Sequence, residues 1–175
     1  MRPGETVHET PDDIRRLQEL LDRSHAAGGR HLRSIITSER RVDAEELVER
    51  LTGMRLLVLA TATADGRPIA GPVDGIFYRG SFHFGSAPDS VRFRHIRARP
   101  HVSATHLPGE EFAVTVHGRA VFVDIQAPED AEFRQTLIDV YVPRYGPDWV
   151  SNFLDSGPMY ARIEAERMFT FKMAS

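Results

Sequence analysis

The chain has 175 residues, 25 of them acidic against 22 lysines and arginines, which gives a formal net charge of -3 and a pI near 6.2. This balance offers no whole-molecule attraction to nucleic acid, so any anion-binding site must be local. The absence of cysteine excludes disulfides, thiolate nucleophiles and cysteine-ligated metal clusters, and it fits a cytoplasmic protein.

No stretch of the chain reads as a targeting or membrane segment. The first dozen residues lack the apolar core of a signal peptide. The longest strongly apolar run, Leu56 to Ala60, is far shorter than the ~20 residues that span a membrane. We therefore expect a cytoplasmic protein with no membrane and no nucleic-acid partner.

The N-terminal third predicts two helices. Thr10, Pro11, Asp12 and Asp13 form a helix start, with a hydroxyl cap, proline in the first turn and acidic residues behind it. Gly28 and Gly29 end this helix, and a polar connector leads to a second, shorter one. That second helix is capped by Asp43, ends at Gly53, and turns Leu47, Val48 and Leu51 inward.

From Met54 the pattern changes to strands. A β-prone run from Leu56 to Thr63 is followed by Asp65-Gly66, a pair that favours a hairpin turn. The return strand, Ile69 to Tyr78, contains Gly71, Pro72 and Gly75, which suggests an edge, a bulge or the close approach of a ligand.

Alternation and turn residues predict the remaining elements. A strand from Ser81 to Ser86 precedes a short helix between Pro88 and Pro100, and another strand begins at Val102. A long strand runs from Phe112 to about Ile125 with a bend at Gly118, and a helix follows from Pro128 to about Val142. Turns, with a short helix around Trp149 and Phe153, lead to the last strand.

The last strand has the clearest alternation in the chain. It predicts one face made of Ala161, Ile163, Ala165, Phe169, Phe171 and Met173. The complete set is six antiparallel strands with helices at the N-terminus and between the later strands. This set favours a mainly β fold with α, a closed or half-closed six-stranded antiparallel Greek-key barrel.

The turn between Ser86 and Arg92 is the best candidate for a binding site. Ser86 and Ser90 flank the expected start of a helix, and Arg92 follows within its first turn. Free backbone N–H groups and the helix dipole favour an anion at such a point. We expect this turn to bind the phosphate of a cofactor, with each charge-assisted hydrogen bond contributing about 1.5 to 3 kcal/mol.

Other catalytic chemistries have little support. Eight histidines are present, but His101 and His106 are five apart on a strand and so point to opposite faces. His83 and His117 lie on strands that could be neighbours, and His95 and His117 could line a pocket. No HExxH, GxSxG, Walker or GxGxxG motif occurs. We therefore expect no metal site and name no catalytic residue.

Three stretches resemble the pyridoxamine-phosphate-oxidase-like split barrels, which bind flavin or deazaflavin. They are LATATADGRPIAGPV (Leu59 to Val73), FHFGSAPDSVRFRHIRARPHVSA (Phe82 to Ala104) and VTVHGRA (Val114 to Ala120). The resemblance implies a split barrel over residues 54–175, behind a helical extension over residues 1–53. It also implies a homodimer with cofactor sites at the subunit interface.

The resemblance assigns two groups of cofactor-binding residues. One group holds the phosphate and consists of Ser86, Ser90, Val91 and Arg92. The other lies beside the flavin ring on the glycine-rich strand and consists of Gly71, Pro72, Val73 and Asp74. FMN is the expected cofactor, and the expected reaction is oxidation or reduction of a small-molecule substrate that the sequence does not identify.

The chain also departs from the oxidase itself. The oxidase has basic residues on the strand where this chain has Gly71 and Ile76, and it ends in a basic, tryptophan-containing motif that this chain lacks. We therefore do not expect oxidation of pyridoxamine phosphate. Two alternatives stay open: a deazaflavin-dependent reductase on the same fold, and a non-catalytic module that binds flavin or haem.

Overall fold

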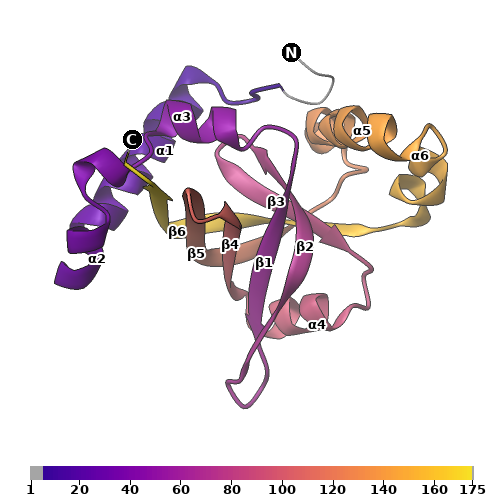
Figure 1. The fold of residues 1–175 in the computed structure, drawn as a ribbon. Helices are drawn as coiled ribbons and strands as arrows, with labels where there is room; N and C mark the ends of the chain where they lie inside the picture. The colour runs from indigo at the N-terminus through magenta and orange to yellow at the C-terminus, as the bar shows by residue number, and fades with distance from the viewer. Residues whose placement is uncertain (1–5, 175) are drawn as a thin grey trace.

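The computed structural model describes residues 6–174 and has a six-stranded closed antiparallel barrel at its centre (Figure 1). Neighbouring strands follow the order β1-β2-β3-β6-β5-β4. This confirms the predicted mainly β architecture. The strands are β1 (Met54–Ala62), β2 (Pro68–Tyr78), β3 (Ser81–Ser86), β4 (His101–Gly109), β5 (Phe112–Val123) and β6 (Met159–Lys172).

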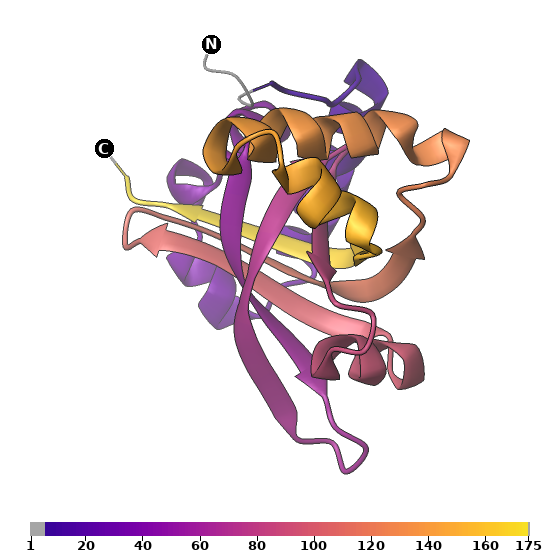
Figure 2. The ribbon, with the colours of Figure 1, turned by 90° about the vertical axis from the view of Figure 1, so that its right-hand side faces the viewer.

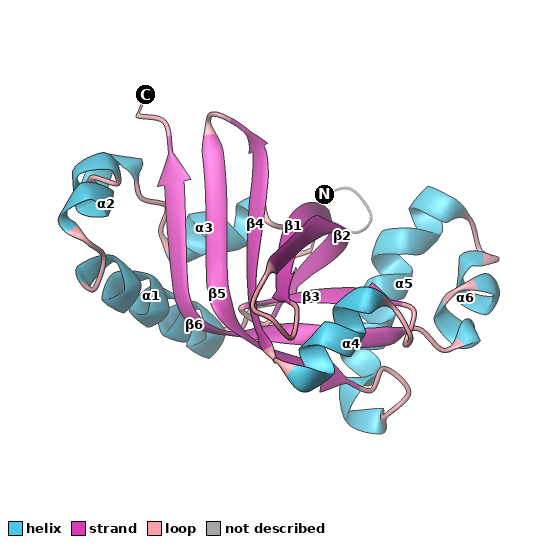
Figure 3. Cartoon of the chain, turned by 90° about the horizontal axis from the view of Figure 1, so that it is seen from below, coloured by secondary structure: helices cyan, strands magenta, loops and turns pink. Residues whose placement is uncertain are grey.

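Helices cover two sides of the barrel (Figure 3). On one side lie α1 (Pro11–Ala26), α2 (Arg30–Ile35), the short 3-10 helix η1 (Ser38–Arg40) and α3 (Ala44–Arg50). Helix α4 (Val91–Ala98) lies beside the β1–β2 hairpin (Figure 2). On the opposite side lie η2 (Pro128–Asp130), α5 (Ala131–Tyr145), α6 (Trp149–Asn152) and η3 (Leu154–Ser156). Helix α2 and η1 fall in the segment predicted to be a polar connector.

The N-terminal helices share one hydrophobic core with the barrel. Leu17 and Leu21 of α1 and Leu47 of α3 are buried in the same cluster as Phe82 and Val114 of the strands. The predicted boundary at residue 54 coincides with the start of β1. The division into an extension and a barrel domain stays a prediction, but the core continues across it.

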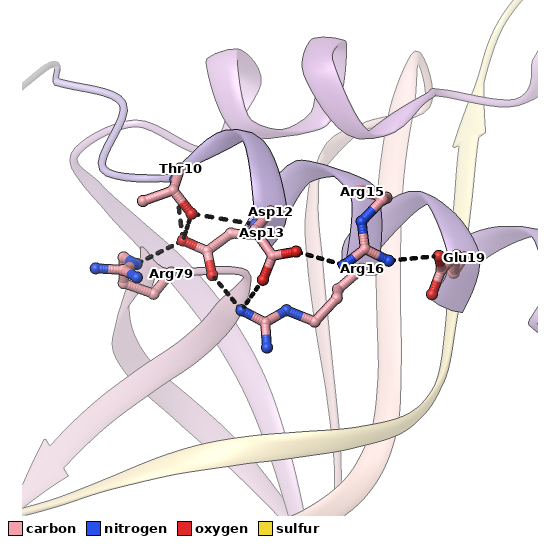
Figure 4. A network of polar contacts seen from close by, with 7 residues as sticks. All are labelled: Thr10, Asp12, Asp13, Arg15, Arg16, Glu19 and Arg79. Atoms are coloured by element: carbon pink, nitrogen blue, oxygen red, sulfur yellow. Dashed lines mark hydrogen bonds and ion pairs between the residues drawn. The ribbon is translucent and has the colours of Figure 1, made fainter.

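A polar network fastens the start of α1 to the β2–β3 turn (Figure 4). The Thr10 hydroxyl accepts a hydrogen bond from the Asp13 backbone N–H, and the Asp13 carboxylate accepts one from the Thr10 backbone N–H, which completes the predicted cap. The Arg79 Nε donates to Asp13 Oδ2 at 2.5 Å. Burial opposes ionisation of Asp13, but hydrogen bonds from Thr10 and Arg79 prevail and lower its pKa. Arg79 has a φ of 51°, a left-handed conformation that non-glycine residues seldom adopt outside turns.

The two faces of β2 have different neighbours. Val73 and Phe77 point into the barrel, where both are buried. Ile76 is buried on the outer face, in a second cluster with Phe133 and Leu137 of α5. Because side chains alternate along a strand, residues an odd number apart on β2 lie on opposite faces of the barrel wall.

The face predicted for the last strand is correct only for its first half. Ala161 and Ile163 are buried as expected, but beyond Glu166 the buried residues are Met168 and Thr170. The β5–β6 register shifts at this point, pairing His117 with Arg167 and Gly118 with Ala165. Glu166 is thus an extra residue in a β-bulge, and it reverses the alternation. Phe169, Phe171 and Met173 therefore lie on the opposite face from Ala161.

None of the helices within residues 6–174 is long and apolar enough to cross a membrane.

Candidate functional site

A cavity of about 260 Å³ lies at one end of the barrel, between the β1–β2 hairpin and α4. The turn between β3 and α4, predicted from the sequence as a binding site, forms one wall of this cavity. Five of the predicted cofactor-binding residues meet here. The lining consists of Leu59, Thr61, Ile69, Ala70, Gly71, Ser86, Ser90, Val91 and Arg92.

Local sequence explains how the serines reach the cavity. Strand β3 ends at Ser86, and a tight turn through Pro88 leads to Ser90, which caps α4. The Ser90 Oγ accepts a hydrogen bond from the Phe93 backbone N–H at 3.4 Å. The N–H groups of Val91 and Arg92 belong to the first turn and lack acceptors within the helix. This end of the cavity is thus rich in hydrogen-bond donors.

Arg92 reaches across the cavity to β2. Its Nη2 donates to the Pro72 carbonyl at 2.9 Å, which holds the guanidinium beside Gly71. Partial burial lowers the pKa of Arg92, but an arginine stays charged at neutral pH. Because a guanidinium carries five N–H donors, the bond to Pro72 leaves others for an anion.

The neighbouring arginines of α4 have structural contacts. Arg97 donates to the Pro88 carbonyl at 2.7 Å, and Arg99 donates to the Ala62 carbonyl at 2.8 Å. These two bonds fasten the C-terminal end of α4 to the turn that precedes the helix and to the hairpin. Arg94 is exposed and lies outside the cavity lining. Arg92 is therefore the arginine that can serve a ligand in this cavity.

The two glycines of β2 differ in their surroundings. A Cβ on Gly71 would meet only Arg92 Nη2, at an ordinary distance of 3.8 Å, so space for a ligand remains there. A Cβ on Gly75 would lie 2.6 Å from Leu57 Cδ1, inside the barrel. Gly75 is thus explained by barrel packing, whereas Gly71 opens onto the cavity.

The other predicted ring-side residues lie elsewhere. Pro72 contributes its carbonyl to Arg92 but is not part of the lining. Val73 is buried in the barrel core. Asp74 lines a different cavity, on the outer face of β2. Contact of Val73 and Asp74 with a cofactor stays a prediction.

Four lining residues were not anticipated from the sequence: Leu59, Thr61, Ile69 and Ala70. Of these four, Thr61 is a polar residue at a position of β1 whose side chain points into the barrel. Its Oγ1 lies 2.9 Å from the Nδ1 of His95 on α4, and its side chain is buried. A polar residue at an inward-facing position next to a hairpin is the feature of the sequence that could have indicated Thr61 as a lining residue.

Within residues 6–174 no group of three histidine or acidic side chains could hold a metal ion. The expectation that His83 and His117 could lie on neighbouring strands is wrong, because β6 lies between β3 and β5. His83 is buried, and its burial lowers its pKa to about 4. His117 lines another cavity and contacts Ser103 at 2.7 Å.

The arrangement suits binding of a phosphate. It offers two hydroxyls, the first N–H groups of a helix, and a guanidinium that a neighbouring strand holds in position. The residues present therefore fit the phosphate of a flavin cofactor. A space of about 260 Å³ is smaller than the roughly 300 to 1,000 Å³ typical of ligand pockets, so one chain encloses only part of such a molecule.

The family model for pyridoxamine 5'-phosphate oxidase matches residues 44–166, more than half of the chain. This range includes β1 to β5, α4 and most of β6. A comparison with curated proteins finds no match.

Solved structures share the fold at low sequence identity. A FAD-binding protein from Mesorhizobium loti is 22% identical, with a TM-score of 0.56 over 77% of this chain and 97% of that one. The heme storage protein HutZ from Vibrio cholerae is 18% identical, with a TM-score of 0.56 over 69% of this chain and 90% of that one. An F420 reductase is 16% identical, with a TM-score of 0.50 over 65% of this chain and 88% of that one. Two further matches are longer proteins, of which 51% and 52% are covered.

Proposed function

The chain belongs to the pyridoxamine 5'-phosphate oxidase family, and we propose that it is a flavin-binding oxidoreductase that carries FMN. Ser86, Ser90 and Arg92 hold the cofactor phosphate, together with the N–H groups of Val91 and Arg92. The flavin supplies hydride or electron transfer when bound. The observation that carries the proposal is the cavity in which both serines meet an arginine fixed to β2.

The chain's own contribution is binding and orientation. Arg92 neutralises the phosphate charge, and its bond to Pro72 reduces the number of side-chain conformations that must be lost on binding. Gly71 leaves the backbone of β2 accessible to the cofactor. Leu59 and Ile69 add an apolar wall that excludes water. This division of labour requires no side chain to act as a nucleophile.

A second copy of the chain completes the site in this proposal. A cavity of about 260 Å³ leaves much of a flavin uncovered. The outer face of the β1–β4 pair carries exposed apolar side chains, with Leu56 60%, Val58 54% and Leu107 63% exposed. Several exposed apolar side chains on one sheet face are typical of a subunit interface. The proposed assembly is a homodimer with the cofactor between its subunits, in the cytoplasm.

Two alternatives have specific support. A deazaflavin coenzyme also carries a phosphate, and one structure with this fold is described as an F420 reductase. A non-catalytic haem-binding module is the other, since HutZ is described as a heme storage protein. The donor-rich cavity, with two hydroxyls and a guanidinium, favours a phosphate-bearing cofactor over haem.

The test is an absorption spectrum of the purified protein, alone and after addition of FMN, FAD, the deazaflavin coenzyme or haemin in turn. Saturable binding of FMN, with a shifted flavin band, is the expected result. Preferential binding of the deazaflavin or a Soret band would replace FMN by the corresponding alternative. Absence of binding to all four would overturn the proposal. Oxidation of a reduced nicotinamide by the loaded protein then separates an enzyme from a carrier.

A further inference from the structure

A second cavity lies on the outer face of the barrel wall, beneath α5 and α6. Its volume is about 270 Å³, and it shares no lining residue with the phosphate cavity. Strand β2 contributes to both, because Gly71 and Asp74 are three residues apart and lie on opposite faces. The lining consists of Asp74, Gly85, Tyr141, Tyr145, Trp149, Phe153 and Tyr160.

Aromatic rings make up most of this lining. The rings of Tyr141 and Trp149 are stacked, with centroids 4.8 Å apart and planes 19° apart. Trp149 and Phe153 are stacked at 5.4 Å, and Tyr141 and Tyr145 at 6.0 Å. The four rings therefore form one continuous aromatic wall rather than isolated contacts.

The floor and the rim of the cavity differ in exposure. Tyr160 and Tyr141 are buried, with 4% and 6% exposed, and form the floor. Tyr145 and Phe153 are 55% and 39% exposed and form the rim. A molecule can therefore enter from solvent. Gly85 adjoins the floor, because a Cβ there would lie 2.7 Å from Tyr160 Cζ.

Asp74 supplies the charge. It carries the one carboxylate among the described residues of that lining, and none of them is basic. Burial, followed by the negative charge of Asp74, raises the pKa of both Tyr141 and Tyr160. Both hydroxyls therefore stay protonated at neutral pH, and Tyr141 donates to Asp74 Oδ2 over a long 3.5 Å. The cavity is negative and aromatic.

Aromatic faces carry a negative potential, so cations bind over them, and Trp gives the strongest effect. Tyr145 already shows this preference: the Arg144 guanidinium lies 5.8 Å from its ring centroid, outside the cavity lining. A carboxylate adds Coulombic attraction and would repel an anionic ligand. A neutral aromatic ligand would leave Asp74 without a counter-charge.

We propose that this second cavity binds a small organic cation of the alkylammonium class, which packs against the aromatic lining with its charge beside Asp74. The alkyl groups on the cation would contact the rings, and Asp74 would supply the counter-ion. The site is separate from the phosphate cavity, so the inference does not depend on the identity of the cofactor.

The experiment uses Trp149 as its reporter, because it is the single tryptophan of the chain. The full-length protein without added flavin is titrated with choline, and the intrinsic fluorescence is followed. The same titration with 3,3-dimethylbutan-1-ol uses a neutral molecule of nearly the same shape. We expect saturable quenching by choline and at least about tenfold weaker binding of the neutral molecule, equivalent to about 1.4 kcal/mol.

A matched pair of variants tests the role of Asp74. Asp74→Asn removes the charge and is expected to weaken choline binding about tenfold. Asp139→Asn removes an acid from the exposed side of α5, outside the cavity lining, and should leave binding unchanged. Equal binding of choline and its neutral counterpart to the wild-type protein would overturn the proposal, whether or not Asp74→Asn folds. So would the absence of saturable quenching up to the solubility limit of choline.

Discussion

The Arg92 guanidinium donates a hydrogen bond to the Pro72 carbonyl, 2.9 Å away, and so joins the first turn of α4 to the middle of β2. The contact keeps a positive charge at the mouth of a cavity whose other polar groups are serine hydroxyls and helix N–H groups. Without a ligand, the same bond satisfies part of a half-buried guanidinium. Arg92 is thus positioned before any anion arrives.

The first prediction concerns this residue. Arg92→Ala should weaken FMN binding about tenfold or more, because a charge-assisted hydrogen bond contributes about 1.5 to 3 kcal/mol. Binding is measured by titration of flavin fluorescence. Arg94→Ala serves as the matched control, because Arg94 lies on the same helix but is exposed and outside the cavity lining. Unchanged affinity in Arg92→Ala, with the fold intact, would remove Arg92 from the site.

The second prediction concerns the bulge between β5 and β6. A Cβ on Gly118 would lie 2.1 Å from the Glu164 carbonyl oxygen. Because this oxygen belongs to the backbone, the clash can be relieved only if the backbone of β5 or β6 moves. Gly118→Ala should therefore lower the free energy of unfolding by about 1 to 3 kcal/mol. Chemical denaturation measures this loss. Gly71→Ala is the comparison, because its Cβ has ordinary space, and equal stability of the two variants would contradict the argument.

The third prediction concerns pH. Burial lowers the pKa of His83 from an ordinary value of 6.5 to about 4. The unfolded chain therefore takes up a proton at a higher pH than the folded one. The free energy of unfolding therefore does not depend on His83 above about pH 6.5. As the pH falls from 6.5 toward 4, protonation of His83 in the unfolded chain lowers the free energy of unfolding, by about 3 kcal/mol in total.

The measurement is the free energy of unfolding by denaturant at a series of pH values between 7 and 4. Burial also lowers the pKa of His106, which adds a loss in the same direction. His83→Phe isolates one histidine, because a phenyl ring can keep the contacts with Tyr78 and Phe133 but does not titrate. The variant should show a shallower pH slope. An identical slope would show that His83 does not lose this stabilisation in acid.

The fourth prediction concerns the proposed dimer. Val58→Lys places a charge in the exposed apolar area formed with Leu56 and Leu107, and burying that charge at an interface is costly. Light scattering should give about twice the 19.7 kDa chain mass for the wild type and the chain mass for the variant. Ile35→Lys, at an exposed apolar residue on α2, should stay dimeric. A monomeric wild type would contradict the proposal.

Features encoded by neighbouring residues were predictable from the sequence. The hairpin at Asp65-Gly66 is present, with Gly66 at a φ of +84°. Thr10 and Asp43 cap the helices that they were expected to cap. Cap and turn chemistry depends on a few adjacent residues, so it can be recognised without the fold. The same local signals indicated Ser86, Ser90 and Arg92, which line one cavity, whereas their role in binding a cofactor stays a prediction.

Features that depend on packing were not predictable. Gly71 and Gly75 look alike in the sequence, yet one opens onto a cavity and the other is closed by Leu57. The aromatic cavity combines β2, β3 and β6 with the segment 141–153, and nothing in any one of these segments indicates it. In β6 the only local sign of the inserted residue is the pair of consecutive polar residues Glu166 and Arg167, and a continuous alternation that skips Arg167 fits the flanking apolar residues equally well.

That inserted residue, Glu166, determines what lies on each side of the wall. After it, Thr170 faces inward and its hydroxyl exchanges two hydrogen bonds with the Val42 backbone, at 3.0 and 3.1 Å, just before α3. Phe169 and Phe171 instead pair across from Thr115 and Ala113 on the outside. Removing this single position would exchange inside for outside over the rest of the strand. The contact of Thr170 with the segment before α3 and the aromatic exterior of the sheet therefore both depend on this one bulge.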